Sequence, residues 1–212
     1  MAQMPERWGD LWGRIGATSD PAPIFAALAE RYGEPHRAYH TLAHVARCLW
    51  ELDHARLLAE RADEAELALW FHDAIYDPHA SDNEARSAAW AGRWLEEGRV
   101  GAEVRARVAG LIRVTDHRAS PPPGDAALVV DIDLTILGAP EEEFDAYERQ
   151  IRREYAFLPE PVFRAGRRGV LERFLARPRL YTTPLFHARY EQAARANLAR
   201  SLARLGPPTG KA

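Results

Sequence analysis

The dipeptide His72-Asp73 is the feature of this chain that most directly indicates chemistry. It follows a strongly apolar stretch, residues 65–71, so burial is expected there and an uncompensated charge would be costly. A divalent metal ion would compensate that charge, because it can bind an imidazole nitrogen and a carboxylate oxygen together. His44 upstream, together with Asp131 and Asp133 downstream, could supply the remaining ligands.

Two ligand choices stay open on the residues alone. Asp131 and Asp133 differ by roughly 200° around a helix, so both are not expected to face one ion. His40 precedes His44 by one helical turn, and such a pair can itself bind a metal. Mixed nitrogen and oxygen ligation favours Mn, Fe, Co, Ni or Zn over Ca, with Mg as a further option.

The composition bounds the class of protein. The chain has 212 residues, 47% of them hydrophobic, and we expect a single domain over residues 1–212. A formal net charge of -3 without a basic stripe argues against a nucleic-acid partner. No apolar run reaches the roughly 18 residues of a membrane span. The N-terminus lacks a signal-peptide apolar region and Cys48 is the only cysteine, so we expect a cytoplasmic protein.

Helices must position the candidate ligands, since helical periodicity covers most of the chain. Asp63 with Glu66, and Ser81 with Glu84, are spaced as capping boxes at helix starts. Residues 126–137 alternate like a strand, but an isolated strand has nothing to pair with, so we predict a buried helix there. We therefore predict an all-α fold with further helices over residues 6–15, 21–32, 42–59, 63–77, 83–97, 104–117, 140–157, 162–176 and 184–205.

The candidates and their flanks resemble a known family. The order His44, His72-Asp73, Asp133 is similar to the H…HD…D signature of the HD superfamily of metal-dependent phosphohydrolases. The flanking blocks resemble those of a bacterial subfamily described as predicted metal-dependent phosphohydrolases: Tyr39-His40-Thr41-Leu42-Ala43-His44, Trp70-Phe71-His72-Asp73-Ala74-Ile75-Tyr76-Asp77-Pro78, Asp82-Asn83-Glu84-Ala85-Arg86-Ser87-Ala88 and Asp133-Leu134-Thr135-Ile136-Leu137-Gly138. The resemblance implies an HD-domain-like helical bundle whose N-terminal and C-terminal helices pack on it. It also implies one divalent ion held by four ligands, His44, His72, Asp73 and Asp133.

The resemblance implies hydrolysis of a small phosphate ester, such as a nucleotide, by a metal-activated water. Besides Asp73, it indicates Glu84 near the metal water and His117 lining the pocket; Glu84 could instead cap its helix. A phosphoryl group also needs positive charge, and Arg37, Arg86 and Arg118 are candidates. We predict Asp73, Glu84, His117 and Arg37 as catalytic residues. No organic cofactor site and no membrane contact are expected, and the oligomeric state is not fixed.

Three alternatives compete with this interpretation. The sequence Asp131-Ile132-Asp133-Leu134-Thr135 matches the DxDx(T/V) pattern of haloacid-dehalogenase-like phosphatases, with Asp131 as nucleophile and Asp133 as acid/base. An HD-fold di-iron oxygenase would need additional histidines, for which His40, His79 and His117 are available. A non-catalytic binding module that keeps its metal for stability is the third alternative.

Overall fold

The computed structural model describes residues 3–206, which form helices and connecting segments without any strand. The predicted all-α fold class is confirmed. The chain divides into two compact units, Met1–Asp133 and Leu134–Ala212, and the expected single domain over residues 1–212 stays a prediction. None of the described helices combines the length and the apolar character needed to cross a lipid bilayer.

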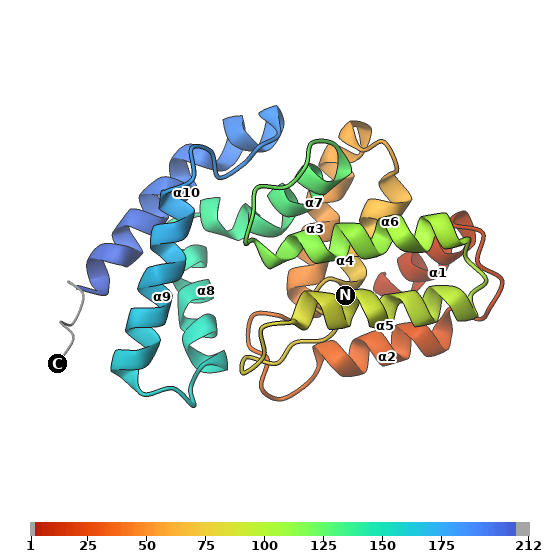
Figure 1. The fold of residues 1–212 in the computed structure, drawn as a ribbon, viewed down its shortest axis with the longest axis horizontal. Helices are drawn as coiled ribbons and strands as arrows, with labels where there is room; N and C mark the ends of the chain where they lie inside the picture. The colour runs from red at the N-terminus through yellow and green to blue at the C-terminus, as the bar shows by residue number, and fades with distance from the viewer. Residues whose placement is uncertain (1–2, 207–212) are drawn as a thin grey trace. The chain divides into compact units, whose positions relative to one another are not determined.

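The first unit is built around a central helix, α4. This helix packs against α1, α3, α5, α6 and α7, and all its residues from Glu64 to Phe71 are buried. Burial on every side explains why its sequence is apolar all round rather than amphipathic. Within this unit, α5 and α6 run side by side (Figure 1). The elements are α1 (Met4–Arg14), α2 (Ala22–Tyr32), α3 (Leu42–Ala55), η1 (Arg56–Leu58), α4 (Ala62–Phe71), α5 (Asn83–Glu97), α6 (Ala102–Arg113), η2 (Val114–Asp116) and α7 (Asp125–Asp133).

The ambiguous segment 126–137 is helical, as predicted. It forms α7 and continues into the 3-10 helix η3 (Leu134–Gly138). Every residue of α7 from Ala127 to Ile132 is buried, including Asp131. Because no face of α7 is left polar for solvent, the 3.6-residue period is absent from the sequence and only a strand-like alternation is visible.

Most of the expected helix boundaries agree with the structure to within a few residues, but α4 ends at Phe71 rather than near Asp77. The predicted capping boxes are also wrong. Arg61 is the N-cap of α4 and Asp82 that of α5, and neither helix start has a side-chain capping bond. The carboxylate of Glu66 does not cap α4, because it is paired with three arginines instead.

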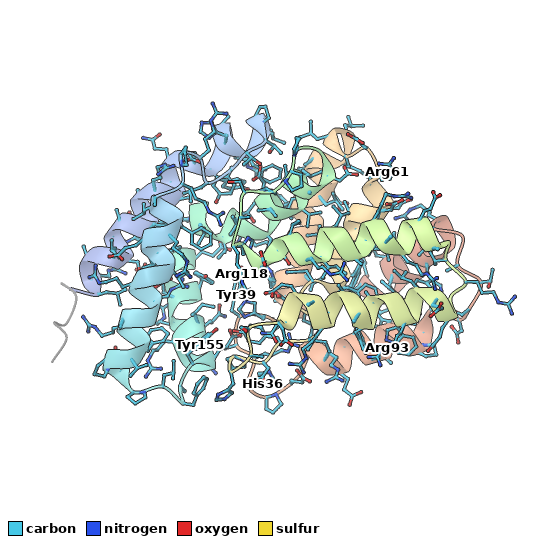
Figure 2. The ribbon with its side chains drawn as sticks, in the orientation of Figure 1. His36, Tyr39, Arg61, Arg93, Arg118 and Tyr155 are labelled. Carbon is cyan, nitrogen blue, oxygen red and sulfur yellow. The ribbon has the colours of Figure 1, made fainter. Side chains whose placement is uncertain are left out.

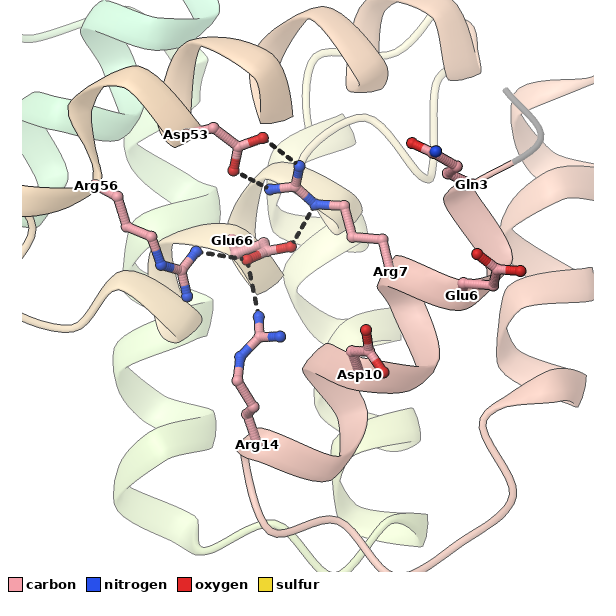
Figure 3. Close-up of a pocket in the computed structure, with 8 residues that line it drawn as sticks. All are labelled: Gln3, Glu6, Arg7, Asp10, Arg14, Asp53, Arg56 and Glu66. Atoms are coloured by element: carbon pink, nitrogen blue, oxygen red, sulfur yellow. Dashed lines mark hydrogen bonds and ion pairs between the residues drawn. The ribbon is translucent and has the colours of Figure 1, made fainter.

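Arginines supply nearly all the positive charge of this chain, and many are exposed, as Figure 2 shows for Arg61 and Arg93. Three others converge on Glu66, whose side chain is 1% exposed. Arg7 Nε, Arg56 Nη1 and Arg14 Nη2 lie 2.7, 2.8 and 3.1 Å from its carboxylate oxygens (Figure 3). A buried carboxylate is tolerated only when its charge is compensated in this way. The cluster therefore fastens α1 and η1 to the central helix.

The second unit consists of η3, α8 (Glu141–Glu154), α9 (Glu160–Leu175) and α10 (Pro184–Arg204). The long helix α10 packs on α9 and on η3. Asn197 Nδ2 donates to the carbonyl oxygens of Leu137 and Ala139 at 2.9 and 2.8 Å. Gly138 allows α10 to approach η3 this closely, because a Cβ at position 138 would lie only 2.8 Å from Cβ of Tyr190 in α10.

Replacing Glu66 should destabilise the first unit. We expect Glu66→Gln to lower its free energy of unfolding by about 3 kcal/mol, because three arginines would lose their buried counter-charge. All six tryptophans belong to this unit, so tryptophan fluorescence during urea unfolding reports on it alone. Glu60→Gln is the matched control, since that side chain is 69% exposed in its pairing with Arg61. Equal stability of the two variants would contradict the role of the cluster.

Glu191 should make the second unit sensitive to acid. Burial acts to raise the pKa of Glu191, but the backbone N–H groups of Tyr181 and Leu180 and the side chain of Arg195 lower it below its ordinary value. A lowered folded-state pKa gives stability that is present above the unfolded value of about 4.3 and is lost as the pH falls through the folded-state pKa. The amides of Leu180 and Tyr181 should therefore exchange faster as the pH falls below about 4 than intrinsic chemistry predicts.

The test of Glu191 is amide hydrogen exchange of residues 180–195, read by mass spectrometry and corrected for intrinsic rates. Glu191→Gln should remove most of the acid-dependent loss of protection. Glu172→Gln, at an exposed position paired with Arg168, should leave the wild-type profile intact. Identical pH profiles for wild type and Glu191→Gln would show that this carboxylate does not carry the effect.

Candidate metal centre

Three helices bring the candidate ligands together inside the first unit. His44 lies in the first turn of α3, His72 is the C-cap residue of α4, and Asp133 is the last residue of α7. These three helices contact one another pairwise, and the side chains of both histidines are buried. Ligands contributed by facing helices are a common way to build a metal site in a helical core.

The donor atoms are spaced as ligands of one ion would be. The Nε2 atoms of His44 and His72 lie 3.0 Å apart. Asp133 Oδ1 is 3.0 Å from His44 Nε2 and 3.4 Å from His72 Nε2. Asp73 Oδ2 is 3.0 Å from His72 Nε2 and 3.6 Å from His44 Nε2. Two donors that each lie about 2.1 Å from one ion, at angles of about 90–110°, are separated by about 3.0–3.4 Å, so the set fits a single cation.

A hydrogen bond to one nitrogen of the His72 ring determines which nitrogen is turned towards the cluster. His72 Nδ1 lies 2.9 Å from the carbonyl oxygen of Leu69. A carbonyl only accepts, so Nδ1 carries the hydrogen and a neutral His72 presents an unprotonated Nε2. That lone pair points at two carboxylates, which are also acceptors. Either a proton on His72 Nε2 or a cation among these groups would compensate the carboxylates. Metal-binding histidines are commonly oriented by such a bond on the other nitrogen.

The electrostatics of the cluster agree with this need. Burial acts to raise the pKa of Asp133, but His72, His117 and His44 outweigh it and hold the pKa well below its ordinary range. The pKa of Asp73 is lowered in the same way, against burial, chiefly by His72 and His40. Burial lowers the pKa of His44. Burial also acts to lower the pKa of His72, but the charges of Asp73 and Asp133 outweigh it and raise that pKa well above its ordinary value. Two ionised carboxylates thus face the imidazoles.

The structure also separates the alternatives that the sequence left open. Asp133 joins the cluster, whereas Asp131, two residues earlier, is directed into the core with its side chain fully buried. His40 is outside the group of mutually close donors formed by His44, Cys48, His72 and Asp133. Its ring stacks on Tyr76 with the ring centroids 4.1 Å apart, and its charge acts on Asp73. Helical geometry explains the first result, since residues two apart point to nearly opposite sides.

One predicted catalytic residue, His117, contacts the cluster, and another, Glu84, is influenced by its charge. His117 Nε2 is 2.9 Å from Asp133 Oδ2, the oxygen that does not face His44. His117 reaches it from a left-handed backbone conformation, φ 54°, a conformation that costs energy for a non-glycine residue. Burial raises the pKa of Glu84, and the charges of Asp73 and Asp116 act in the same direction.

The predicted phosphate-binding arginines differ in their surroundings. Arg37 is fully buried, and its guanidinium donates to backbone carbonyls of His40, Asp73 and Ala74. It is therefore not placed to touch a phosphate, which corrects the prediction that Arg37 is a catalytic residue. Arg118, by contrast, is exposed on the loop after η2 (Figure 2), where it donates to the carbonyl of Ser81.

Cys48 is the one member of the cluster that sequence reasoning missed. Its sulfur, His44, His72 and Asp133 offer donor atoms that all lie within 4.8 Å of one another. Sγ is 3.7 Å from Nε2 of His44 and 3.8 Å from Nδ1. These nearly equal distances place the sulfur beside the imidazole rather than along its Nε2 lone pair. The i, i+4 spacing from His44 is the sequence signal that could have found it.

Comparisons of the chain with protein-family models, with curated proteins and with solved structures found no match. The resemblance to the HD superfamily therefore stays a prediction. Any assignment of function to this chain rests on the geometry of the cluster together with that resemblance.

Metal binding should distinguish the two aspartates of α7. We expect Asp133→Asn to weaken binding of Mn²⁺, Co²⁺ or Zn²⁺ by at least roughly 100-fold, because it removes a charged donor from the cluster. Asp131→Asn should leave the dissociation constant within about threefold, since this residue is outside the donor set. Isothermal titration of chelator-treated protein with each metal measures both. Equal losses in the two variants would contradict the assignment of Asp133.

Proposed function

We propose that this chain is a metal-dependent phosphohydrolase that acts on a small phosphate ester. The observation that carries the proposal is the convergence of His44, His72, Asp73 and Asp133: the two imidazole Nε2 atoms lie 3.0 Å apart, and each carboxylate has an oxygen 3.0–3.6 Å from both of them. Their order along the chain is also that of the HD superfamily signature. Two nitrogen and two oxygen donors leave coordination positions open on a six-coordinate ion, which is what a substrate or a water molecule requires.

A divalent ion at this cluster would lower the pKa of a water molecule and polarise a phosphoryl oxygen. The surrounding residues have separate tasks. His117 holds Oδ2 of Asp133 and so orients that carboxylate. Glu84, whose pKa is influenced by the charge of Asp73, is the candidate for transferring a proton to a leaving alcohol. Arg118, exposed next to His117 in the sequence, is the candidate for a phosphate contact.

The aspartate-nucleophile alternative fits the structure poorly. It requires Asp131 to meet a substrate at the end of a strand, but Asp131 is fully buried in α7 and residues 3–206 contain no strand. The di-iron alternative requires further histidines around a second ion. Among residues 3–206, the donors that converge as a group are His44, Cys48, His72 and Asp133, which is one set of ligands rather than two.

Phosphatase activity should depend on Asp73. Chelator-treated protein is reloaded with Mn²⁺, Co²⁺, Ni²⁺, Fe²⁺, Zn²⁺ or Mg²⁺ and is given nucleoside monophosphates, sugar phosphates and p-nitrophenyl phosphate. We expect phosphate release with at least one metal. Asp73→Ala should lower kcat/KM by at least roughly 100-fold, because it removes a donor from the cluster.

The outcomes separate the candidate functions. Absence of phosphate release from protein with confirmed stoichiometric metal would contradict hydrolysis and favour a binding module. Loss of activity in Asp131→Asn at unchanged metal content would support the aspartate nucleophile instead. Two irons per chain by element analysis, with consumption of dioxygen, would support the oxygenase.

A further inference from the structure

We propose that Arg37 is a positioning residue that holds Asp73 in the cluster, an inference that rests on the proposed metal site. Arg37 lies in the segment between α2 and α3, and its side chain is fully buried. A buried guanidinium must find partners for its donors and its charge. Two of its acceptors, the carbonyl oxygens of Asp73 and Ala74, belong to the turn that carries Asp73.

The guanidinium spans two backbone segments at once. Its Nη1 donates to the carbonyl oxygen of Asp73 at 2.7 Å and to that of His40 at 3.0 Å. Its Nη2 donates to the carbonyl oxygen of Ala74 at 3.0 Å. Arg37 thus ties the turn after α4 to the segment that leads into α3, where His44 lies.

The remainder of the turn is held by other side chains, so Arg37 has a task of its own. Tyr32 donates to the carbonyl of Trp70, and Ser87 donates to that of Ile75. Asn83 Nδ2 donates to the carbonyl of Asp77. These bonds fix the backbone before and after Asp73. The carbonyls of Asp73 and Ala74 themselves are held by Arg37.

Only an arginine can satisfy this arrangement. Its planar fork presents several donors in fixed directions, whereas a lysine ammonium is a compact charge that cannot span the same acceptors. The guanidinium also stacks between two rings, with its Cζ 5.1 Å from the Tyr32 centroid and 5.5 Å from the Tyr76 centroid. Glu34 Oε2, 3.1 Å from Nε, supplies the counter-charge.

The experiment is a double-mutant cycle that uses the metal alone as probe. Binding of Co²⁺ is measured by competition with a chromophoric chelator for wild type, Arg37→Lys, Asp73→Ala and the double variant. We expect Arg37→Lys to raise the dissociation constant by roughly 10–100-fold, the usual effect of losing a residue that orients a ligand. In the Asp73→Ala background the same change should alter it by less than about threefold, because the ligand that Arg37 positions is gone.

Arg31→Lys is the matched control. Arg31 contacts the same Glu34 at 3.0 Å, but its side chain is 45% exposed. We expect its dissociation constant for Co²⁺ to equal that of wild type. Glu34→Ala is the second variant, to be used if Arg37→Lys does not fold. It keeps the guanidinium and removes its counter-charge, and it should raise the dissociation constant by roughly fivefold, again only when Asp73 is present.

Each outcome decides something. Tight Co²⁺ binding that Asp73→Ala weakens but that neither Arg37→Lys nor Glu34→Ala alters would overturn the positioning role and leave the proposed function intact. If Arg37→Lys weakens Co²⁺ binding by the same factor in the wild-type and Asp73→Ala backgrounds, Arg37 has a general structural role. This result also overturns the positioning role. Absence of Co²⁺ binding by wild type would overturn the proposed function and this inference together.

Discussion

The first unit depends on one electrostatic constraint: groups that can only accept hydrogen bonds, or that point a lone pair, meet inside a helical core. The Nε2 of His72 is turned towards Asp73 and Asp133 because its other nitrogen is bound by the Leu69 carbonyl. Burial makes such a gathering unfavourable unless positive charge lies among these groups. The convergence of α3, α4 and α7 is therefore best understood as a structure arranged around a positive charge.

That constraint explains why the backbone after α4 is irregular and yet firmly held. Ending the helix at Phe71 turns Asp73 towards the cluster, and the carbonyls that the turn exposes are then taken up by Tyr32, Arg37 and Ser87. Tyr32 and Arg37 come from the end of α2 and the segment after it, and Ser87 comes from α5. The site is thus positioned by tertiary hydrogen bonds as much as by helices, and its precision depends on residues that no substrate would touch.

Glu66 is a second buried group, away from the site, whose charge is compensated by distant partners. Its carboxylate is buried by the packing of α4 and is compensated by Arg7, Arg14 and Arg56. Locally, Asp63 and Glu66 have the spacing of a helix cap. The cap does not form, because three guanidiniums offer a buried carboxylate more than one backbone N–H does. Local sequence rules fail at such positions because the competing partners are distant in the chain.

The sequence by itself determined the helical class, most helix boundaries, and the residue types and order of the candidate ligands, because periodicity and spacing are local properties. It could not choose between Asp131 and Asp133 from the residues alone, find Cys48 beside His44, or recognise that Arg37 binds backbone carbonyls. The tertiary structure decided these points. Each depends on which face of one helix meets which face of another, and on which buried donors find which acceptors across long sequence separations.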